Sequence, residues 1–119
     1  MIALHSRVQV LVFREPVDMR KQYEGLFNLA STVLGRKVFD GDIFVFIGRT
    51  RKRVKLLWWD GTGLCILAKR LTRGRFIAPW LHKGEGALTL SRTELALLVE
   101  GCDLVGTTPL SPPPWSPGG

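Results

Sequence analysis

The sequence has few of the residues that cross-link small proteins or carry them into membranes. Its 119 residues include two cysteines, Cys65 and Cys102, which lie far apart. They form no CxxC pair, and no spacing resembles a structural zinc site, so neither metal binding nor thiol redox chemistry is expected. The longest early apolar run, Val8 to Phe13, is far shorter than the roughly 20 residues that span a bilayer. We therefore expect a cytoplasmic protein without disulfides, cofactor or membrane segment.

Motifs that mark common enzyme classes are also missing. The sequence contains no GxxxxGK[ST] phosphate loop and no GxSxG nucleophile elbow. Asp40, Asp42 and Asp60 could hold Mg²⁺, but each lies beside a glycine, and turn formation explains these aspartates without a metal. Cys65 lies in an apolar run that disfavours its thiolate. The sequence predicts neither a reaction nor catalytic residues.

The composition fits one globular domain. Hydrophobic residues make up 45% of the chain and charged residues 23%. Five of the seven prolines lie between Pro109 and Pro117, and two glycines end the chain. We expect a single domain over residues 1–105 and a flexible Pro/Gly-rich tail over residues 106–119.

Hydrophobic periodicity predicts several strands. The apolar and β-branched runs are Arg7 to Phe13, Ile43 to Ile47, Arg53 to Trp59 and Leu64 to Arg70, with a possible further strand from Arg75 to Ala78. Asp60-Gly61-Thr62-Gly63 is a strong turn signal between two of them. Consecutive strands with short connections indicate an antiparallel meander of about four to five strands.

Two helices are expected beside these strands. A stripe that includes Leu26 and Ala30 predicts a helix over residues 19–34, capped by Asp18 and ended by Gly35. Ser91-Arg92-Thr93-Glu94 is a capping-box pattern that opens a second helix, closed by Gly101. The simplest architecture is an α+β fold with both helices packed on one face of the sheet.

The positive charge is concentrated in one part of the sequence. Lysine and arginine number 17 against 10 acidic residues, for a net charge of +7. Nine of the basic residues lie between Arg49 and Arg75, where Asp60 is the only acid. Such clustering favours an anionic partner such as nucleic acid. Solubility of an exposed sheet would need only two or three of these charges.

Strand alternation predicts how these charges are presented. Val54, Leu56 and Trp58 project to one face of their strand, and Trp58 is expected in the core. The opposite face is expected to be basic, with Lys69 added from the next strand and loop cations at its margins. Trp59 on that face could stack on a base or simply pack. The predicted DNA-binding residues are Arg49, Arg51, Lys52, Arg53, Lys55, Trp59, Lys69, Arg70, Arg73 and Arg75.

Several ordered motifs resemble those of one known family. They are Val17-Asp18-Met19-Arg20-Lys21 with Gly25-Leu26, Phe44-Val45-Phe46 with Gly48-Arg49, Lys55-Leu56-Leu57-Trp58-Trp59-Asp60-Gly61 with Gly63, Lys69-Arg70-Leu71, Arg73-Gly74-Arg75-Phe76, and the late Leu95, Leu98, Glu100-Gly101 and Asp103. Together they resemble TnpB, the small accessory protein encoded by bacterial insertion sequences of the sixty-six type. That family is unrelated to the RNA-guided nuclease of the same name. The resemblance runs from about Ile2 to Leu104.

The resemblance implies a role in DNA transposition without known catalytic residues. Members are encoded beside a separate, larger transposase and are needed for the element to move. We therefore expect a non-enzymatic accessory factor in the bacterial cytoplasm, associated with the nucleoid, whose partners are DNA at the element ends and the transposase. The alternative is a protein-interaction module that docks transposase or another subunit without contacting DNA. Edge strands leave a homodimer open.

Overall fold

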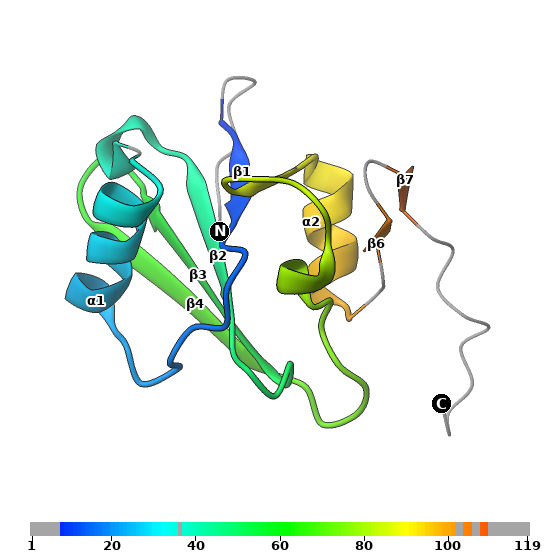
Figure 1. Cartoon of the computed structure of the whole chain (residues 1–119). Helices are drawn as coiled ribbons and strands as arrows, with labels where there is room; N and C mark the ends of the chain where they lie inside the picture. The colour runs from blue at the N-terminus through cyan, green and yellow to red at the C-terminus, as the bar shows by residue number, and fades with distance from the viewer. Residues whose placement is uncertain (1–7, 36, 102–103, 106–107, 110–119) are drawn as a thin grey trace.

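Five strands of the protein form one sheet with the order β4-β3-β2-β1-β5 (Figure 1). The computed structural model describes residues 8–35 and 37–101, and the backbone of two short strands beyond them. The sheet strands are β1 (Val10–Val12), β2 (Ile43–Ile47), β3 (Arg53–Trp59), β4 (Leu64–Arg70) and β5 (Leu88–Leu90); β6 (Leu104–Val105) and β7 (Thr108–Pro109) pair separately. The predicted bounds of β2, β3 and β4 are confirmed.

The sheet is mixed, so the α+β class is confirmed but the purely antiparallel meander is wrong. β1 pairs with β2 in parallel and with β5 in antiparallel orientation, while the β2–β3 and β3–β4 pairs are antiparallel. The connection between β1 and β2 contains α1 (Tyr23–Asn28), and such a crossover returns the chain in the same direction. β5, which has only three residues, gives no periodicity signal.

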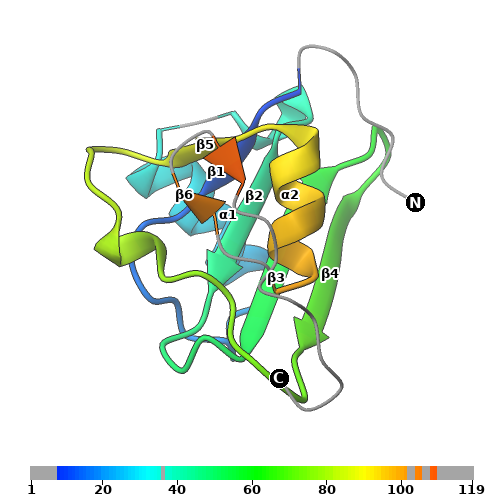
Figure 2. The same cartoon turned by 90° about the vertical axis from the view of Figure 1, so that its right-hand side faces the viewer.

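The two helices cover opposite faces of the sheet (Figures 1 and 2). α1 continues into a π-helical turn, η1 (Leu29–Val33), and packs on one face, whereas α2 (Arg92–Val99) packs on the other. The prediction that both helices pack on one face is therefore wrong. Two short 3-10 turns, η2 (Val38–Asp40) and η3 (Pro79–Leu81), complete the helical elements of the described residues.

The side chains of β2 explain this three-layer arrangement. Ile43, Val45 and Ile47 belong to the hydrophobic cluster on the α2 side. Phe44 and Phe46 belong to the cluster on the α1 side, and all five side chains are fully buried. A central strand that is apolar on both faces needs a cover on each.

The first helix begins later than the sequence predicts. α1 starts at Tyr23, with Gln22 as a cap residue that makes no side-chain cap bond. Asp18 instead accepts a hydrogen bond from the backbone N–H of Arg20 at 2.9 Å and pairs with its guanidinium at 2.8 Å. Short acidic side chains often bond to nearby backbone groups instead of capping a helix, and Asp18 does so here. The end is as predicted, because Gly35 has a left-handed φ of 63°.

The second helix matches its prediction. Ser91 Oγ accepts from the Glu94 backbone N–H at 3.1 Å, and Glu94 Oε1 accepts from the Ser91 N–H at 2.8 Å. These two bonds form the predicted capping box, and Gly101 follows the helix with a φ of 87°.

Two other predicted segments have different outcomes. Residues 75–78 form no strand; the Phe76 N–H donates to the Arg51 carbonyl at 2.7 Å, and the Phe76 side chain fills the core on the α2 side. The predicted tail over residues 106–119 lies outside the described residues, except for β7.

Candidate nucleic-acid interface

Backbone pairing brings the basic segments together at one end of the molecule. β3 and β4 pair in the register that places Arg53 opposite Arg70. Beyond the strands, the Leu71 N–H donates to the Lys52 carbonyl at 2.8 Å, so residues 71–76 continue alongside the β2–β3 loop. Both loops lie at the lower end of the molecule in Figure 1.

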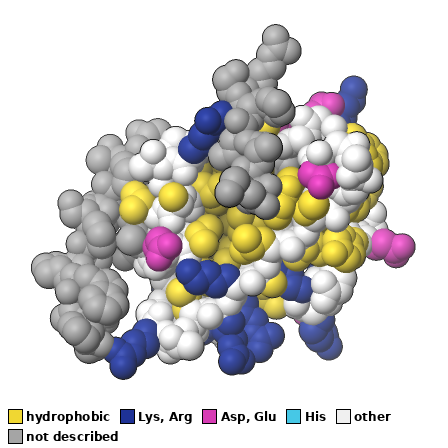
Figure 3. Space-filling model, turned by 180° about the vertical axis from the view of Figure 1, so that it is seen from behind, with side chains coloured by type: hydrophobic (Ala, Val, Ile, Leu, Met, Phe, Trp, Pro, Cys, Tyr) yellow, Lys and Arg dark blue, Asp and Glu magenta, His cyan; other side chains and the backbone are white. Residues whose placement is uncertain are grey.

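Five exposed arginines gather at this end, which we call the basic end. They are Arg49 in the β2–β3 loop, Arg53 on β3, Arg70 at the end of β4, and Arg73 and Arg75 in the loop that follows. Residues 48–59 and 64–76 contain no aspartate or glutamate. Lysine and arginine side chains collect along the lower border of the face shown in Figure 3. The end is therefore basic without acidic side chains from its own segments.

Two further predicted cations hold the loops of the basic end together. Arg51 Nε donates to the Phe76 carbonyl at 2.8 Å, and Lys52 Nζ donates to the Gly74 carbonyl at 2.8 Å. Both side chains are half-buried. These bonds cross from one loop to the other, so they restrict the backbone that carries the exposed arginines.

The prediction that one face of β3 is open and basic is wrong for the residues that follow Arg53. Lys55 is only 8% exposed, and its ammonium donates to the Lys21 carbonyl at 2.7 Å. Leu57, on the same face, is fully buried in the α1-side cluster. The segment that leads into α1 covers this face of β3, because the apolar side chains of the face need burial. Only Arg53 stays exposed on it.

Lys69 lies on the face opposite to the predicted one. It pairs with Val54, whose side chain is in the α2-side cluster, and its Nζ donates to the Val99 carbonyl in the last turn of α2 at 2.8 Å. A cation at a helix C-terminus is stabilised by the helix dipole. The prediction that Lys69 joins the face of Arg53 is therefore wrong.

The two tryptophans of β3 both pack within the protein. Trp58 packs against the α2-side cluster, as predicted. Trp59 packs edge to face on Phe39, with 5.0 Å between their ring centroids. The ring centroids of Phe39 and Phe27 are 5.6 Å apart. Of the two predicted options for Trp59, packing is the one observed.

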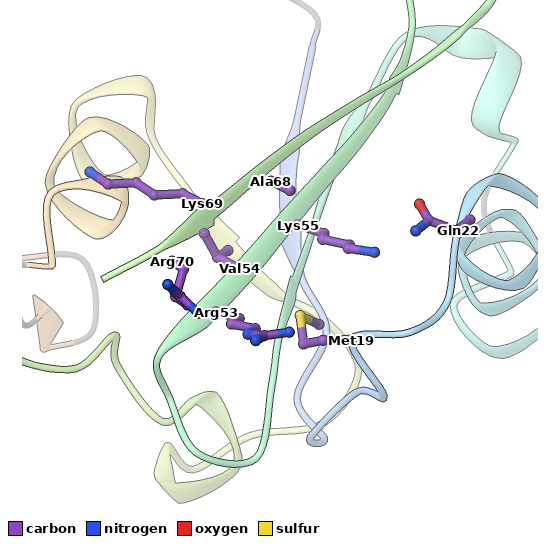
Figure 4. A pocket seen from close by; sticks show the side chains of 8 residues that line it. All are labelled: Met19, Gln22, Arg53, Val54, Lys55, Ala68, Lys69 and Arg70. Atoms are coloured by element: carbon purple, nitrogen blue, oxygen red, sulfur yellow. The ribbon is translucent and has the colours of Figure 1, made fainter. Parts of the chain in front are cut away.

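An open depression of about 420 Å³ lies between β3, β4 and the segment that leads into α1. Arg53 and Arg70 lie side by side at one end of it, and Figure 4 shows Met19 next to Arg53. Gln22 lines the opposite wall. The sequence pattern missed both uncharged residues, because they come from an irregular segment rather than from the basic cluster. The depression gives the arginine pair a concave setting.

Gly48 explains how that irregular segment approaches the hairpin. A Cβ atom at Gly48 would lie 2.7 Å from the Met19 Cγ atom, which is closer than van der Waals contact. The glycine is buried, and its N–H donates to the Arg53 carbonyl at 3.0 Å. Its missing side chain lets Met19 pack against the start of the hairpin.

Comparisons with known proteins identify the family. The family model described as IS66 Orf2 like protein matches residues 8–108. The chain belongs to this family. Two similar proteins from Sinorhizobium fredii (strain NBRC 101917 / NGR234), uncharacterized proteins y4jC and y4hO, are 37% and 36% identical over 103 residues. These alignments cover 87% of this chain and 86% and 88% of the relatives. No solved structure matches. Membership associates this IS66 Orf2-like chain with a bacterial insertion sequence.

Asp60 and Asp42 of this IS66 Orf2-like chain accept hydrogen bonds from backbone N–H groups. Asp60 Oδ1 accepts the N–H groups of Thr62 and Gly63 at 2.9 and 3.0 Å, and these bonds lower the pKa of Asp60 to about 2. Asp42 is buried, and its Oδ1 accepts from the Gln9 N–H at 3.1 Å. Turn formation at Asp60 is therefore confirmed. The part of the chain that the structure describes holds no group of three or more potential metal ligands.

Two further features of this IS66 Orf2-like chain concern thiol chemistry and membranes. Partial burial and the neighbouring Asp60 carboxylate raise the pKa of the Cys65 thiol, as its apolar strand predicts. A raised pKa lowers the fraction of reactive thiolate. Among the described helices, none has the length and apolar character needed to cross a bilayer.

Proposed function

We propose that the protein is a non-catalytic accessory factor of transposition that binds DNA at the element ends through its basic end and assists a separate transposase. Family membership supports the association with an insertion sequence. One observation carries the DNA contact: Arg53 and Arg70 are directly opposite each other on neighbouring strands. Like charges in such a pair destabilise a sheet, and a phosphate bound between them removes that cost.

The chemistry of the basic end suits a phosphodiester backbone. A guanidinium group binds phosphate oxygens with two parallel hydrogen bonds, and it stays charged at any physiological pH. Five arginines are exposed there, and the bonds from Arg51 and Lys52 fix the loops that carry three of them. Contacts to phosphates position a protein on DNA without reading bases, so we expect weak sequence preference.

The test is a fluorescence-anisotropy titration of the purified chain against a labelled element-end duplex and a scrambled duplex at several salt concentrations. The double variant Arg53→Gln/Arg70→Gln should bind both duplexes roughly tenfold more weakly at low salt. Its plot of log affinity against log salt should be shallower by about two, since each phosphate contact contributes roughly 0.9 to the slope.

The matched control is Lys37→Gln/Lys83→Gln, which removes the same charge from two exposed lysines outside the basic end. It should keep most of the affinity. Equal losses in the two double variants would show that net charge, rather than the arginine pair, drives binding. If the unmodified chain binds neither duplex at low salt, the basic end does not contact DNA, and docking to an acidic transposase surface replaces this proposal.

A further inference from the structure

β4 is an edge strand with one side unpaired within the described residues. It has seven residues, whereas β5 at the other edge has three. Edge strands present free backbone donors and acceptors, and proteins usually protect them with charges or prolines. The first five residues of β4, Leu64 to Ala68, contain neither. This edge has the features of a pairing surface.

The hydrogen-bond alternation identifies which backbone groups face outward. The Gly48 N–H donates to the Arg53 carbonyl, and the Leu71 N–H donates to the Lys52 carbonyl. In an antiparallel ladder every second residue bonds to the neighbouring strand. Since Leu71 bonds toward β3, so do Lys69, Leu67 and Cys65, which precede it at two-residue steps. The outward groups are therefore those of Leu64, Ile66, Ala68 and Arg70.

The side chains along this edge are partly exposed and mostly apolar. Leu67 is 37% exposed, Ala68 is exposed, and Leu64 and Ile66 are half-buried. Figure 2 places β4 at the side of the molecule seen in Figure 3, where hydrophobic side chains gather above the basic border. Pairing of this edge would bury apolar surface as well as backbone groups.

We propose that β4 pairs antiparallel with β4 of a second copy of this chain, with the two-fold axis at Leu67. In this register Leu64 lies opposite Arg70 of the partner, and Ile66 lies opposite Ala68 of the partner. All four outward-facing residues then form hydrogen-bonded pairs, and the two Leu67 residues form a non-hydrogen-bonded pair on the axis. A shift by one residue would place outward groups opposite inward ones and lose the ladder.

Charge placement favours a second copy in this orientation. Lys69 and Arg70 end the strand, so antiparallel pairing separates the two Arg70 residues by roughly 20 Å at about 3.4 Å per residue. That separation exceeds the Debye length of roughly 8 to 10 Å at physiological salt, so their repulsion is screened. Arg70 instead approaches the turn that precedes Leu64 in the partner, where Asp60 is ionised. Parallel pairing would bring the cations together.

The first test measures the mass of the full chain by sedimentation equilibrium. The unmodified chain should have twice the monomer mass of 13.3 kDa at micromolar concentrations. Leu67→Lys places two ammonium groups opposite each other on the axis and should give a monomer. Thr89→Lys, which adds the same charge to the exposed position on β5, should stay dimeric. A monomeric unmodified chain, or a Leu67→Lys dimer, would overturn the proposal.

The second test fixes the register by cross-linking. In a Cys65→Ser/Cys102→Ser background, Leu67→Cys places two thiols on the axis. A non-hydrogen-bonded antiparallel pair has Cα atoms about 4.5 Å apart, within the range of a disulfide. Mild oxidation should therefore yield a covalent dimer on a non-reducing gel, and Thr89→Cys in the same background should not. Equal yields from both variants, or no cross-link through Leu67→Cys, would contradict the proposed axis.

Discussion

At the scale of single residues, the cations of the basic segment divide into two groups. Lys55 and Lys69 donate to backbone carbonyls from opposite faces of the sheet, whereas Arg53 and Arg70 stay exposed at the basic end. An ammonium that donates to a backbone carbonyl contributes to the fold, whereas the exposed side chains of Arg53 and Arg70 remain available to a ligand. The two groups should therefore respond differently to substitution.

Lys55→Ala tests this division. It removes the bond to the Lys21 carbonyl and the packing of a side chain that is 8% exposed, so the free energy of unfolding should fall by about 2 kcal/mol. DNA affinity, measured where the variant is fully folded, should stay unchanged. Arg53→Ala should do the reverse, with stability kept and affinity reduced. Urea unfolding and anisotropy measure the two effects, and a loss of affinity in folded Lys55→Ala would contradict the division.

The Asp60 turn gives a pH dependence with a definite sign. Hydrogen bonds lower the pKa of Asp60 from 3.8 to about 2 in the folded chain, so its stabilising effect is present above the unfolded value and is lost as pH falls toward 2. Asp60→Asn keeps an acceptor oxygen but cannot titrate. Its Tm should therefore decline less than that of the unmodified chain between about pH 5 and pH 2. Parallel Tm curves would show that Asp60 contributes nothing; Asp18 titrates identically in both proteins.

Among the secondary-structure elements, sequence patterns predicted those whose signal lies in neighbouring residues. β2, β3 and β4 are runs of five to seven residues with clear turns between them, and the capping box of α2 is a contiguous motif. The parallel pairing of β1 with β2 is set by a crossover, and β5 has three residues, so neither leaves a local signal. The apolar residues on both faces of β2 were the available sign that helices cover both sides.

At the candidate site, too, local features could be predicted from the sequence and long-range ones could not. The basic cluster was evident from neighbouring residues in the sequence, because Arg49 to Arg75 is one segment. Which cations share a face depends on the β3–β4 register, which pairs Arg53 with Arg70 and Lys69 with Val54. Met19 reaches the site through a contact with Gly48 that no spacing rule describes. Long-range register and packing thus decided the parts that sequence reasoning missed.

At the scale of the whole molecule, the two proposals combine into one expectation. Arg70 ends β4 at the basic end, and an antiparallel β4 pair directs these ends away from each other. A dimer would therefore present two basic ends on opposite sides, each available to a separate duplex. A dimer with this arrangement would hold two DNA segments together, and the proposed role at the two ends of a mobile element requires such pairing.

A bridging assay checks this expectation. A duplex fixed to beads should capture a second, labelled duplex in the presence of the unmodified chain. Leu67→Lys should bind a single duplex with nearly unchanged affinity but capture little of the second, because it has one basic end per particle. Arg53→Gln/Arg70→Gln should remain dimeric, yet both its binding of a single duplex and its capture of the second should weaken, by roughly tenfold in affinity at low salt. Full capture by a monomeric Leu67→Lys would show that bridging does not use the β4 pair, since one copy would then hold both duplexes.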